Sequence, residues 1–503
     1  MWSNRLLLAV CLLVIIVLTA LDLGLVRSFS AVVFLLAGAG VAGLIWKHSE
    51  WPSSEPHRWI SRILIPLAFS LRGLLLAVAF SIEQADNLST IGVDAAYFLH
   101  WGARIAEFLP SYYDVSSYYL AGTYDVGFHY FLGFALWISG GDLLAVHVLL
   151  ALFGAFCPFL LWQVGKPILK ERAVWPALLL TLSPLSVYLA TVDLVKDGLL
   201  TFVFLLTLWA AQQILDGKFR RGWAPVLLVI GFVSARLIRS YVGLALEVGL
   251  LAFPLLFLAW RRFPTLDQSR RYLSRVVVLA VLFIGSESAL RAVGEPFAFQ
   301  VVFSNVNWLS DKRKAFFGPA GRFEALLFRR GSVSGLRGSP EFSGSLLGEK
   351  QWLELVEPAR PRRANYVLEV VRRTYGPFLW TPPTEDHMFH FLIGNWPAYL
   401  DTLLWYWAFP FGICGAWFLL LKRRWDASLV AGFVLLFLLL LFIFNVSFRQ
   451  RGSNLMPLLL IAAVTGWSEA SRPLKRTILL LQAAAVFLLA AAYWLIRIRS
   501  GLS

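Results

Sequence analysis

The apolar run ISRILIPLAFSLRGLLLAVAFSI, residues 60–82, is followed by IGVDAAYFLH, residues 91–100. The first stretch is long enough to cross a hydrocarbon core of about 30 Å, which takes roughly 20 apolar residues. If it spans the membrane, Asp94 lies just outside it, in a segment rich in acidic residues. A carboxylate in that place is a catalytic base, a metal ligand or an ordinary solvated charge.

Composition assigns the chain to a broad class. Of its 503 residues 58% are hydrophobic and 15% are charged, and long apolar runs recur from end to end. These features predict an all-α polytopic membrane protein. The net charge of +15 is explained by basic residues in cytoplasmic loops, so nucleic acid is not expected as a partner. The three cysteines lie in apolar runs without a CxxC pair, which argues against a disulfide framework or a zinc site.

The apolar runs predict about 13 transmembrane helices. Short basic loops between them place the N-terminus in the cytoplasm and the segments 83–141 and 293–395 on the outer side. Within the first outer segment, residues 127–139 are too few to span comfortably, so we expect a helix that lies in the membrane interface. The predicted spans are 5–22, 29–46, 60–82, 142–163, 174–191, 195–215, 223–239, 241–260, 273–292, 396–421, 426–446, 454–468 and 474–496.

Four parts of the chain follow from this topology. Residues 1–59 hold two N-terminal helices, and 60–292 form a membrane core with the outer loop 83–141. Residues 293–395 form a mixed, soluble outer loop, and 396–503 carry the C-terminal helices. The C-terminus is expected outside, although Arg497 and Arg499 do not follow the charge pattern.

Unusual polar residues gather on the predicted outer side. Charges inside or against a bilayer are costly and are commonly kept for a path, a partner or a reaction. The polar residues on this side are Asp94, Asp193, Lys196, Asp197, Arg236, Arg239, Glu247, Glu287, Arg449 and Arg451.

This layout resembles the GT-C superfamily of membrane glycosyltransferases, which includes protein O-mannosyltransferases and the aminoarabinose transferase of lipid A. The resemblance covers residues 60–292. It rests on the acidic start of the first outer loop, Asp94-Ala-Ala-Tyr97, on the aromatic and glycine-rich interfacial helix, and on outer-end residues at Lys196-Asp197, Arg236 and Arg239. The two additional N-terminal helices depart from that pattern, and the first loop lacks an adjacent acidic pair, so a divalent metal is not supported.

The resemblance implies transfer of a sugar from a polyprenyl-phosphate donor to a lipid-linked or surface glycan acceptor. Asp94 would be the base, with Asp197 or Asp193 positioning it or the sugar. Lys196, Arg236, Arg239, Arg449 and Arg451 would bind the donor phosphate, because Arg presents a rigid fork of donors to phosphate. The substrate-binding candidates are Tyr97, Trp101, Tyr124, Tyr241 and Glu247. Such an enzyme would lie in a bacterial inner membrane, with its active site facing outward.

Each candidate also has a structural explanation. An acidic residue in an outer loop is usually just solvated, and Lys196 and Asp197 could form an interfacial pair. Arg236 and Arg239 could anchor lipid headgroups, and Glu385, Asp386, His387 and His390 match no zinc signature.

Two other functions stay open at this point. An O-antigen polymerase or ligase would rely on outer arginines and a large late loop. A lipid-linked sugar flippase or transporter would place polar residues at mid-bilayer depth.

Overall fold

The computed structural model describes the helical part of the chain. The described residues are 29–48, 51–86, 93–108, 127–190, 196–217, 223–260, 266–292, 396–422, 424–444 and 455–499. Within these ranges every regular element is a helix and no strand occurs, as expected for an all-α protein. The predicted first span, 5–22, and the outer loop 293–395 lie outside the described residues.

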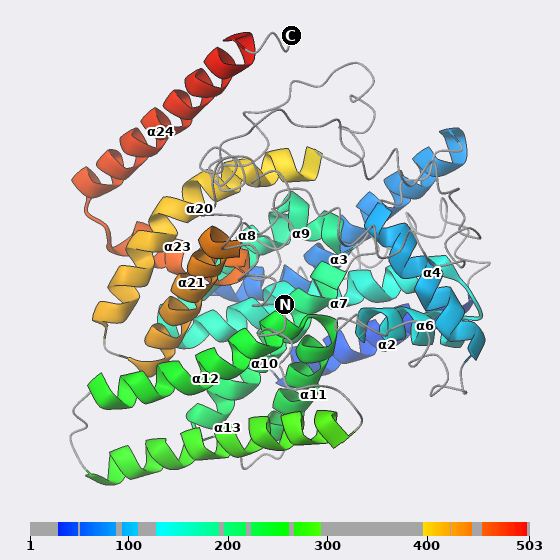
Figure 1. The fold of residues 1–503 in the computed structure, drawn as a ribbon, viewed down its shortest axis with the longest axis horizontal. Helices are drawn as coiled ribbons and strands as arrows, with labels where there is room; N and C mark the ends of the chain where they lie inside the picture. Colours follow the sequence, from blue (N-terminus) through cyan, green and yellow to red (C-terminus); the bar gives the residue numbers. More distant parts are fainter. Residues whose placement is uncertain are drawn as a thin grey trace, which may run out of the picture.

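Helices lie side by side across the molecule (Figure 1). They are α2 Phe29–His48, α3 Glu55–Asp86, α4 Val93–Phe108, α6 Gly127–Ser139, α7 Leu143–Leu169, η2 Lys170–Ala173, α8 Val174–Leu182, α9 Pro184–Leu189, α10 Lys196–Leu215, α11 Trp223–Ile238, α12 Ser240–Trp260, α13 Leu266–Ala292, α20 Trp396–Leu421, α21 Trp425–Phe444, α23 Met456–Glu469 and α24 Arg472–Arg499.

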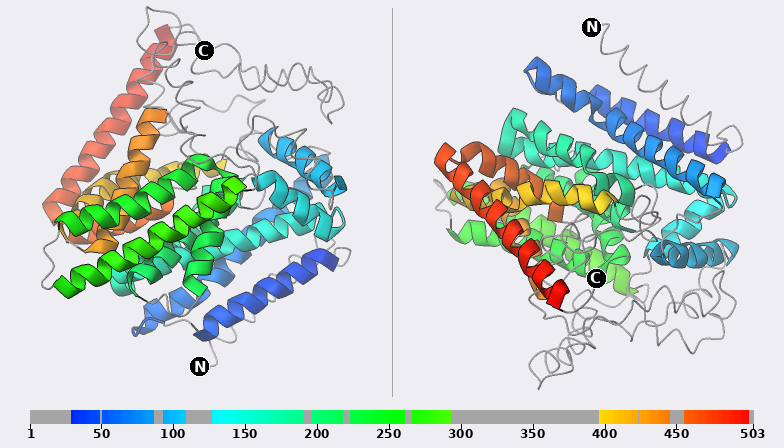
Figure 2. Two further views of the ribbon diagram at one scale, coloured as in Figure 1. Left: turned by 60° about the horizontal axis from the view of Figure 1, so that its bottom comes forward. Right: turned by 90° about the horizontal axis from the view of Figure 1, so that it is seen from above.

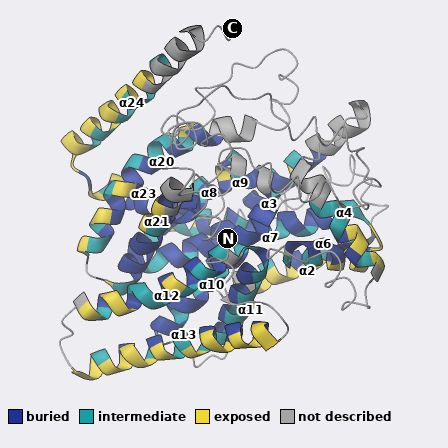
Figure 3. Cartoon of the chain, viewed as in Figure 1, coloured by how far each residue is buried: buried dark blue, intermediate teal, exposed yellow. Residues whose placement is uncertain are grey.

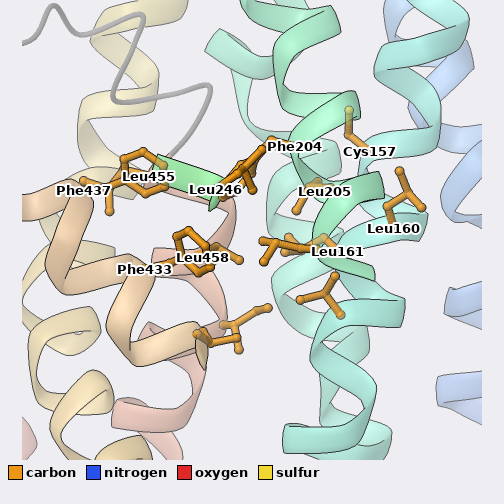
Figure 4. Close-up of a cluster of buried hydrophobic side chains, with 14 of the residues drawn as sticks. Cys157, Leu160, Leu161, Phe204, Leu205, Leu246, Phe433, Phe437, Leu455 and Leu458 are labelled. Carbon is orange, nitrogen blue, oxygen red and sulfur yellow. The ribbon is translucent and has the colours of Figure 1, made fainter. Parts of the chain in front are cut away.

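The centre of the bundle is formed by α7 and α10. Helix α7 packs against α2, α3, α8 and α10, and α10 in turn packs against α11. The close-up of this interior shows Leu161 of α7, Phe204 of α10, Leu246 of α12 and Phe433 of α21 meeting in one apolar cluster (Figure 4). These large side chains pack against one another, and their contacts join the N-terminal and C-terminal helices into one body.

Six described helical stretches are long and apolar enough to cross a membrane: Glu55–Ala77, Leu143–Leu182, Lys196–Leu215, Tyr241–Ala259, Leu266–Ala292 and Asp401–Leu421. Four shorter apolar helices accompany them: Ser30–Leu44, Trp223–Ile238, Trp425–Leu439 and Met456–Glu469. The chain is therefore a multi-pass helical protein by length and composition, and the count of about 13 spans stays a prediction.

The predicted span 174–191 is wrong as a continuous helix. Helix α8 ends at Leu182, Ser183 has an extended backbone (φ −64°, ψ 114°), and α9 starts at Pro184. The residue before a proline is pushed out of the helical region by contact with the proline ring, so the pair Ser183-Pro184 breaks the helix. Apolar periodicity alone does not report that break.

The predicted short helix at residues 127–139 is present as α6. Its buried side, which includes Phe128 and Leu132, packs against α4, while Phe134, Trp137 and Ile138 are exposed. Both sides of α6 are thus apolar, as expected for a helix with one face toward the protein and the other toward lipid. Its placement at the membrane interface remains a prediction.

Loops predicted on the cytoplasmic side meet at one end of the bundle. Arg275 of α13 donates to the carbonyl of Leu215 at the end of α10 (2.7 Å), and Arg424 donates to the carbonyl of Pro167 at the end of α7 (2.7 Å). The same region holds Trp51 stacked on Trp162, with ring centroids 5.4 Å apart. We call this part of the molecule the basic end.

Helices α20 and α23 are in backbone contact. A Cβ atom at Gly415 would collide with the carbonyl oxygen of Ala462, and one at Gly466 would collide with that of Phe411. Small residues allow two membrane helices to approach closely, and van der Waals packing then holds them together. By contrast α24 extends away from the bundle with a largely exposed surface (Figures 2 and 3).

Replacement of Gly415 by Ala tests this contact. Alanine is favoured over glycine inside a helix by about 1 kcal/mol, but here a backbone carbonyl blocks the methyl group. We expect a net loss of about 1–3 kcal/mol from overpacking, measured as a lower Tm of the purified protein in detergent. Gly73→Ala in α3 is the matched control, because nothing lies within 4 Å of its added Cβ, and it should leave the Tm unchanged or raise it. Equal Tm values for both variants would contradict the close contact.

Candidate functional site

Several predicted site residues lie outside the description. Asp193, Tyr124, Arg449 and Arg451 are not among the described residues. Asp94 and Tyr97 lie in the first turns of α4, but their side chains are not described. Trp101 is half-buried in α4. The remaining candidates, Lys196, Asp197, Arg236, Arg239, Tyr241 and Glu247, are brought together at the end of the bundle opposite the basic end.

Four helix ends create this polar cluster. The chain alternates direction, so the start of α10, the end of α11, the start of α12 and the end of α13 come to the same place. Lys196 and Asp197 open α10, Arg236 lies in the last turn of α11, and Glu287 lies near the end of α13. We use the name polar cluster for these residues together with Arg239, Tyr241 and Glu247.

The strongest interaction in the cluster is a buried ion pair. Nε of Arg236 donates to Oε1 of Glu287 at 3.2 Å, and the two side chains are only 1% and 6% exposed. Removing charges from water is costly, and an ion pair repays that cost only with good geometry and further hydrogen bonds. Arg236 is therefore already neutralised inside the protein, which differs from the open phosphate clamp that the sequence suggests.

Glycine makes room for this pair. A Cβ atom at Gly243 of α12 would lie 2.8 Å from Cα and 3.0 Å from Cβ of Arg236. Helix α12 therefore passes directly over the backbone that carries Arg236. A larger residue at position 243 would collide with Arg236, so the glycine permits the close crossing of α11 and α12.

Arg239 is more accessible than Arg236. Its side chain is 14% exposed, its Nη1 donates to the hydroxyl of Tyr241 (3.0 Å), and it lies 4.0 Å from Oδ1 of Asp197. The guanidinium also lies over the ring of Tyr241, 5.4 Å from the centroid. Arg239 thus connects the start of α10 to the junction between α11 and α12.

Helix α4 reaches this cluster through the aromatic side chain of Phe98. Nζ of Lys196 lies 5.6 Å from the ring centroid of Phe98, and this ring also contacts His129 of α6 (5.1 Å between centroids). Asp94 precedes Phe98 by four residues and so belongs to the same face of α4, one turn away. The contact places Phe98 of α4 beside the start of α10, and the role of Asp94 stays a prediction.

Glu247 completes the charge balance. It lies close enough to Arg236 and Glu287 to interact electrostatically with both. Among the described side chains of the cluster, three cations, Lys196, Arg236 and Arg239, stand against three carboxylates, Asp197, Glu247 and Glu287. A set without net charge is less costly inside a bundle than an unbalanced one.

Sequence reasoning gave Glu287 no role in the site and did not single out the buried charged residues Arg72 and Asp401. Arg72 of α3 is fully buried, and Nη2 of Arg72 lies 3.4 Å from the hydroxyl of Ser186. Ser183, at the break between α8 and α9, donates to Oδ1 of Asp401 of α20 at 2.5 Å. Both charged residues stand within apolar runs of the sequence, which is the signal that would have pointed to them.

No group of three potential metal ligands occurs among the described residues. Glu385, Asp386, His387 and His390 lie outside them. The polar cluster offers two neighbouring carboxylates, Glu247 and Glu287, but Glu287 already pairs with the positive charge of Arg236.

Comparison with known proteins gives no match to a family model or to a curated protein.

Replacement of Glu287 by Gln tests the buried ion pair. It leaves the Arg236 guanidinium buried without its carboxylate, and we expect a loss of about 3–5 kcal/mol in stability, measured as a lower midpoint of thermal or denaturant unfolding. The double variant Arg236→Met/Glu287→Leu removes both charges and should recover much of that loss.

The matched control for this prediction is an exposed ion pair. Arg104 and Glu107 of α4 lie 3.7 Å apart and are 48% and 63% exposed, so Glu107→Gln should change stability by less than about 1 kcal/mol. Equal losses of stability in Glu287→Gln and Glu107→Gln would show that the buried ion pair contributes no more to stability than an exposed one.

Proposed function

We propose that the chain is a membrane glycosyltransferase of the GT-C type. It transfers a sugar from a polyprenyl-phosphate donor to a lipid-linked or cell-surface glycan acceptor. The observation that carries the proposal is the contact between Lys196 and Phe98. It joins the helix that bears Asp94 to the helix end that bears Lys196, Asp197 and their partner Arg239.

The reaction follows from the residue types. The Asp94 carboxylate takes the proton of the acceptor hydroxyl while the hydroxyl oxygen bonds to the anomeric carbon. The bond between that carbon and the phosphate oxygen breaks, and the electron pair leaves with the polyprenyl phosphate. A cation placed at the leaving oxygen stabilises this developing charge. The expected outcome is inversion at the anomeric carbon.

Burial divides the work between the two arginines. Arg239 is the more exposed of the two and has the forked geometry that suits a phosphate, so the proposal gives the leaving phosphate to Arg239 and Lys196. Arg236, neutralised by Glu287, is a positioning residue that fixes the end of α11. Tyr241 orients Arg239 through its hydroxyl. Tyr97, Trp101, Tyr124 and Glu247 remain candidates for sugar contacts.

The proposed location follows from the charge pattern. The basic loops face the cytoplasm and the polar cluster faces outward, as expected for an enzyme in a bacterial inner membrane. Asp193, Arg449 and Arg451 keep their proposed roles as a second acidic residue and further phosphate contacts. Membrane lipids surround the bundle, and no resident metal is part of the proposal.

Replacement of Asp94 by Asn tests the base. Loss of a general base costs about 100-fold to 10,000-fold in rate, and we expect a drop of that size in transfer of radiolabelled sugar from a polyprenyl-phosphate donor to a membrane glycan extract. Glu107→Gln on the same helix is exposed and should retain full activity. If Asp94→Asn retains full transfer activity while Arg449→Ala or Arg451→Ala abolishes it, the result favours a polymerase or ligase of the O-antigen type.

A second candidate function is favoured by one specific observation. Buried charges at Arg72 and Asp401 lie within candidate spans, and the helix break between α8 and α9 directly follows the span Leu143–Leu182. Broken helices with buried polar groups are typical of transporters, so a flippase for lipid-linked sugars is the alternative. Movement of a fluorescent lipid-linked sugar across proteoliposomes without any new glycosidic bond would support the flippase and contradict the transferase.

A further inference from the structure

Arg72 has no opposite charge among the described residues. It lies inside the candidate span Glu55–Ala77, about 21 Å along α3 from the end of that helix. The side chain is 0% exposed. A charged side chain at such depth is costly, and it is normally compensated by a partner of opposite charge.

The partners that Arg72 does have are neutral. Nη1 donates to the carbonyl of Ala68 in its own helix (2.9 Å), and Nη2 donates to the hydroxyl of Ser186 (3.4 Å). Nε has no hydrogen-bond partner in the described part of the chain. Two neutral contacts, one of them long, do not offset the desolvation of a guanidinium. In the polar cluster, by contrast, Arg236 has a carboxylate partner in Glu287.

Small residues surround the guanidinium. An added Cβ at Gly154 of α7 would lie 2.7 Å from Nε of Arg72 and would also collide with Ala190. On the other side, Ser186 belongs to α9, a helix of only six residues that begins at the break after Ser183. Helix α9 is the smallest element packed around Arg72, so its displacement opens the guanidinium with the least loss of packing.

Hydrogen bonds connect this place to the C-terminal helices. The amide of Ser186 donates to the hydroxyl of Ser183 (3.2 Å), and that hydroxyl donates to Asp401 of α20 (2.5 Å). The position of α9 therefore depends on helices from both halves of the chain.

We propose that Arg72 is the anchor of an anion-binding site at the break between α8 and α9, and that this site takes a phosphate ester. A guanidinium binds phosphate through parallel N–H···O bonds. The phosphate would supply the negative charge and the hydrogen-bond acceptor that Arg72 lacks among the described residues. Phosphate of this chemistry comes from a lipid headgroup or from free phosphate. The site is separate from Arg239, and it does not require the transferase to be correct.

The test measures binding to the full-length protein in detergent. Its probes are farnesyl phosphate, farnesol and inorganic phosphate, which distinguish the phosphate group, the lipid tail and the free ion. The Arg239→Gln background removes one of the two proposed phosphate contacts of the polar cluster, and the further change in affinity caused by an Arg72 variant in this background reports on Arg72. Dissociation constants come from the rise in Tm with probe concentration.

The expected results are specific to the phosphate group. Farnesyl phosphate should stabilise the Arg239→Gln protein and farnesol should not. Addition of Arg72→Gln should raise the dissociation constant for farnesyl phosphate about tenfold to hundredfold, since the charge-assisted hydrogen bonds between the guanidinium and the phosphate are lost. The same loss for inorganic phosphate would identify the free ion as a ligand, and no binding of the free ion would identify a lipid headgroup.

Two variants control for folding. Arg62→Gln on the same helix removes an arginine that lies over the ring of Trp51, 5.8 Å from its centroid, and it should bind farnesyl phosphate as the parent does. Arg72→Lys keeps the charge without the forked geometry and should bind with intermediate affinity, which gives a readout if Arg72→Gln does not fold.

The proposal is overturned if neither Arg72 variant changes the affinity for any phosphate probe. If Arg239→Gln alone abolishes phosphate binding, the ligand belongs to the polar cluster, and the inference about Arg72 fails while the transferase proposal stands. If phosphate binding depends on Arg72 but Asp94→Asn leaves sugar transfer unchanged, the proposed function fails and the anion site stands.

Discussion

The need to neutralise buried charge determines how the helices of this protein meet. Arg236 and Glu287 come from α11 and α13, and their ion pair is nearly shielded from solvent. An uncompensated charge in such surroundings would cost several kcal/mol, so the pair fixes the relative position of two helix ends. The nearby contact of Gly243 with Arg236 then fixes α12. Asp197 and Arg239 extend the same arrangement to α10.

Much of the helical architecture can be predicted from the sequence because apolar length is a strong signal. The runs at 195–215, 223–239 and 241–260 correspond closely to α10, α11 and α12. The run at 174–191 is different, because its composition is that of a span while the proline at 184 divides it. Local backbone chemistry overrides hydropathy there. The first predicted span and the loop 293–395 lie outside the described residues, so their predictions stand as they were.

The polar cluster could be predicted in part. Charge alternation along the chain places Lys196, Asp197, Arg236 and Arg239 on one side, and the structure brings their helix ends together. Pairing is another matter, because partners distant in sequence cannot be read from a single chain. Glu287 lies 51 residues from Arg236, and Asp401 lies 218 residues from Ser183. Only the packing of the bundle reveals that Arg236 pairs with Glu287 and that Arg239 is the more exposed of the two arginines.

The backbone contact between α20 and α23 has a mechanical consequence. Their glycines hold the two helices at one place, and Lys422, just beyond α20, pairs with Glu469 at the end of α23 at 3.0 Å. The backbone contact and the ion pair together hold α20 and α23 as one packed pair. Asp401, near the start of α20, is held by Ser183 beside the short helix α9. A shift of α9 would therefore act on α20 and α23 together, through the hydrogen bond between Ser183 and Asp401.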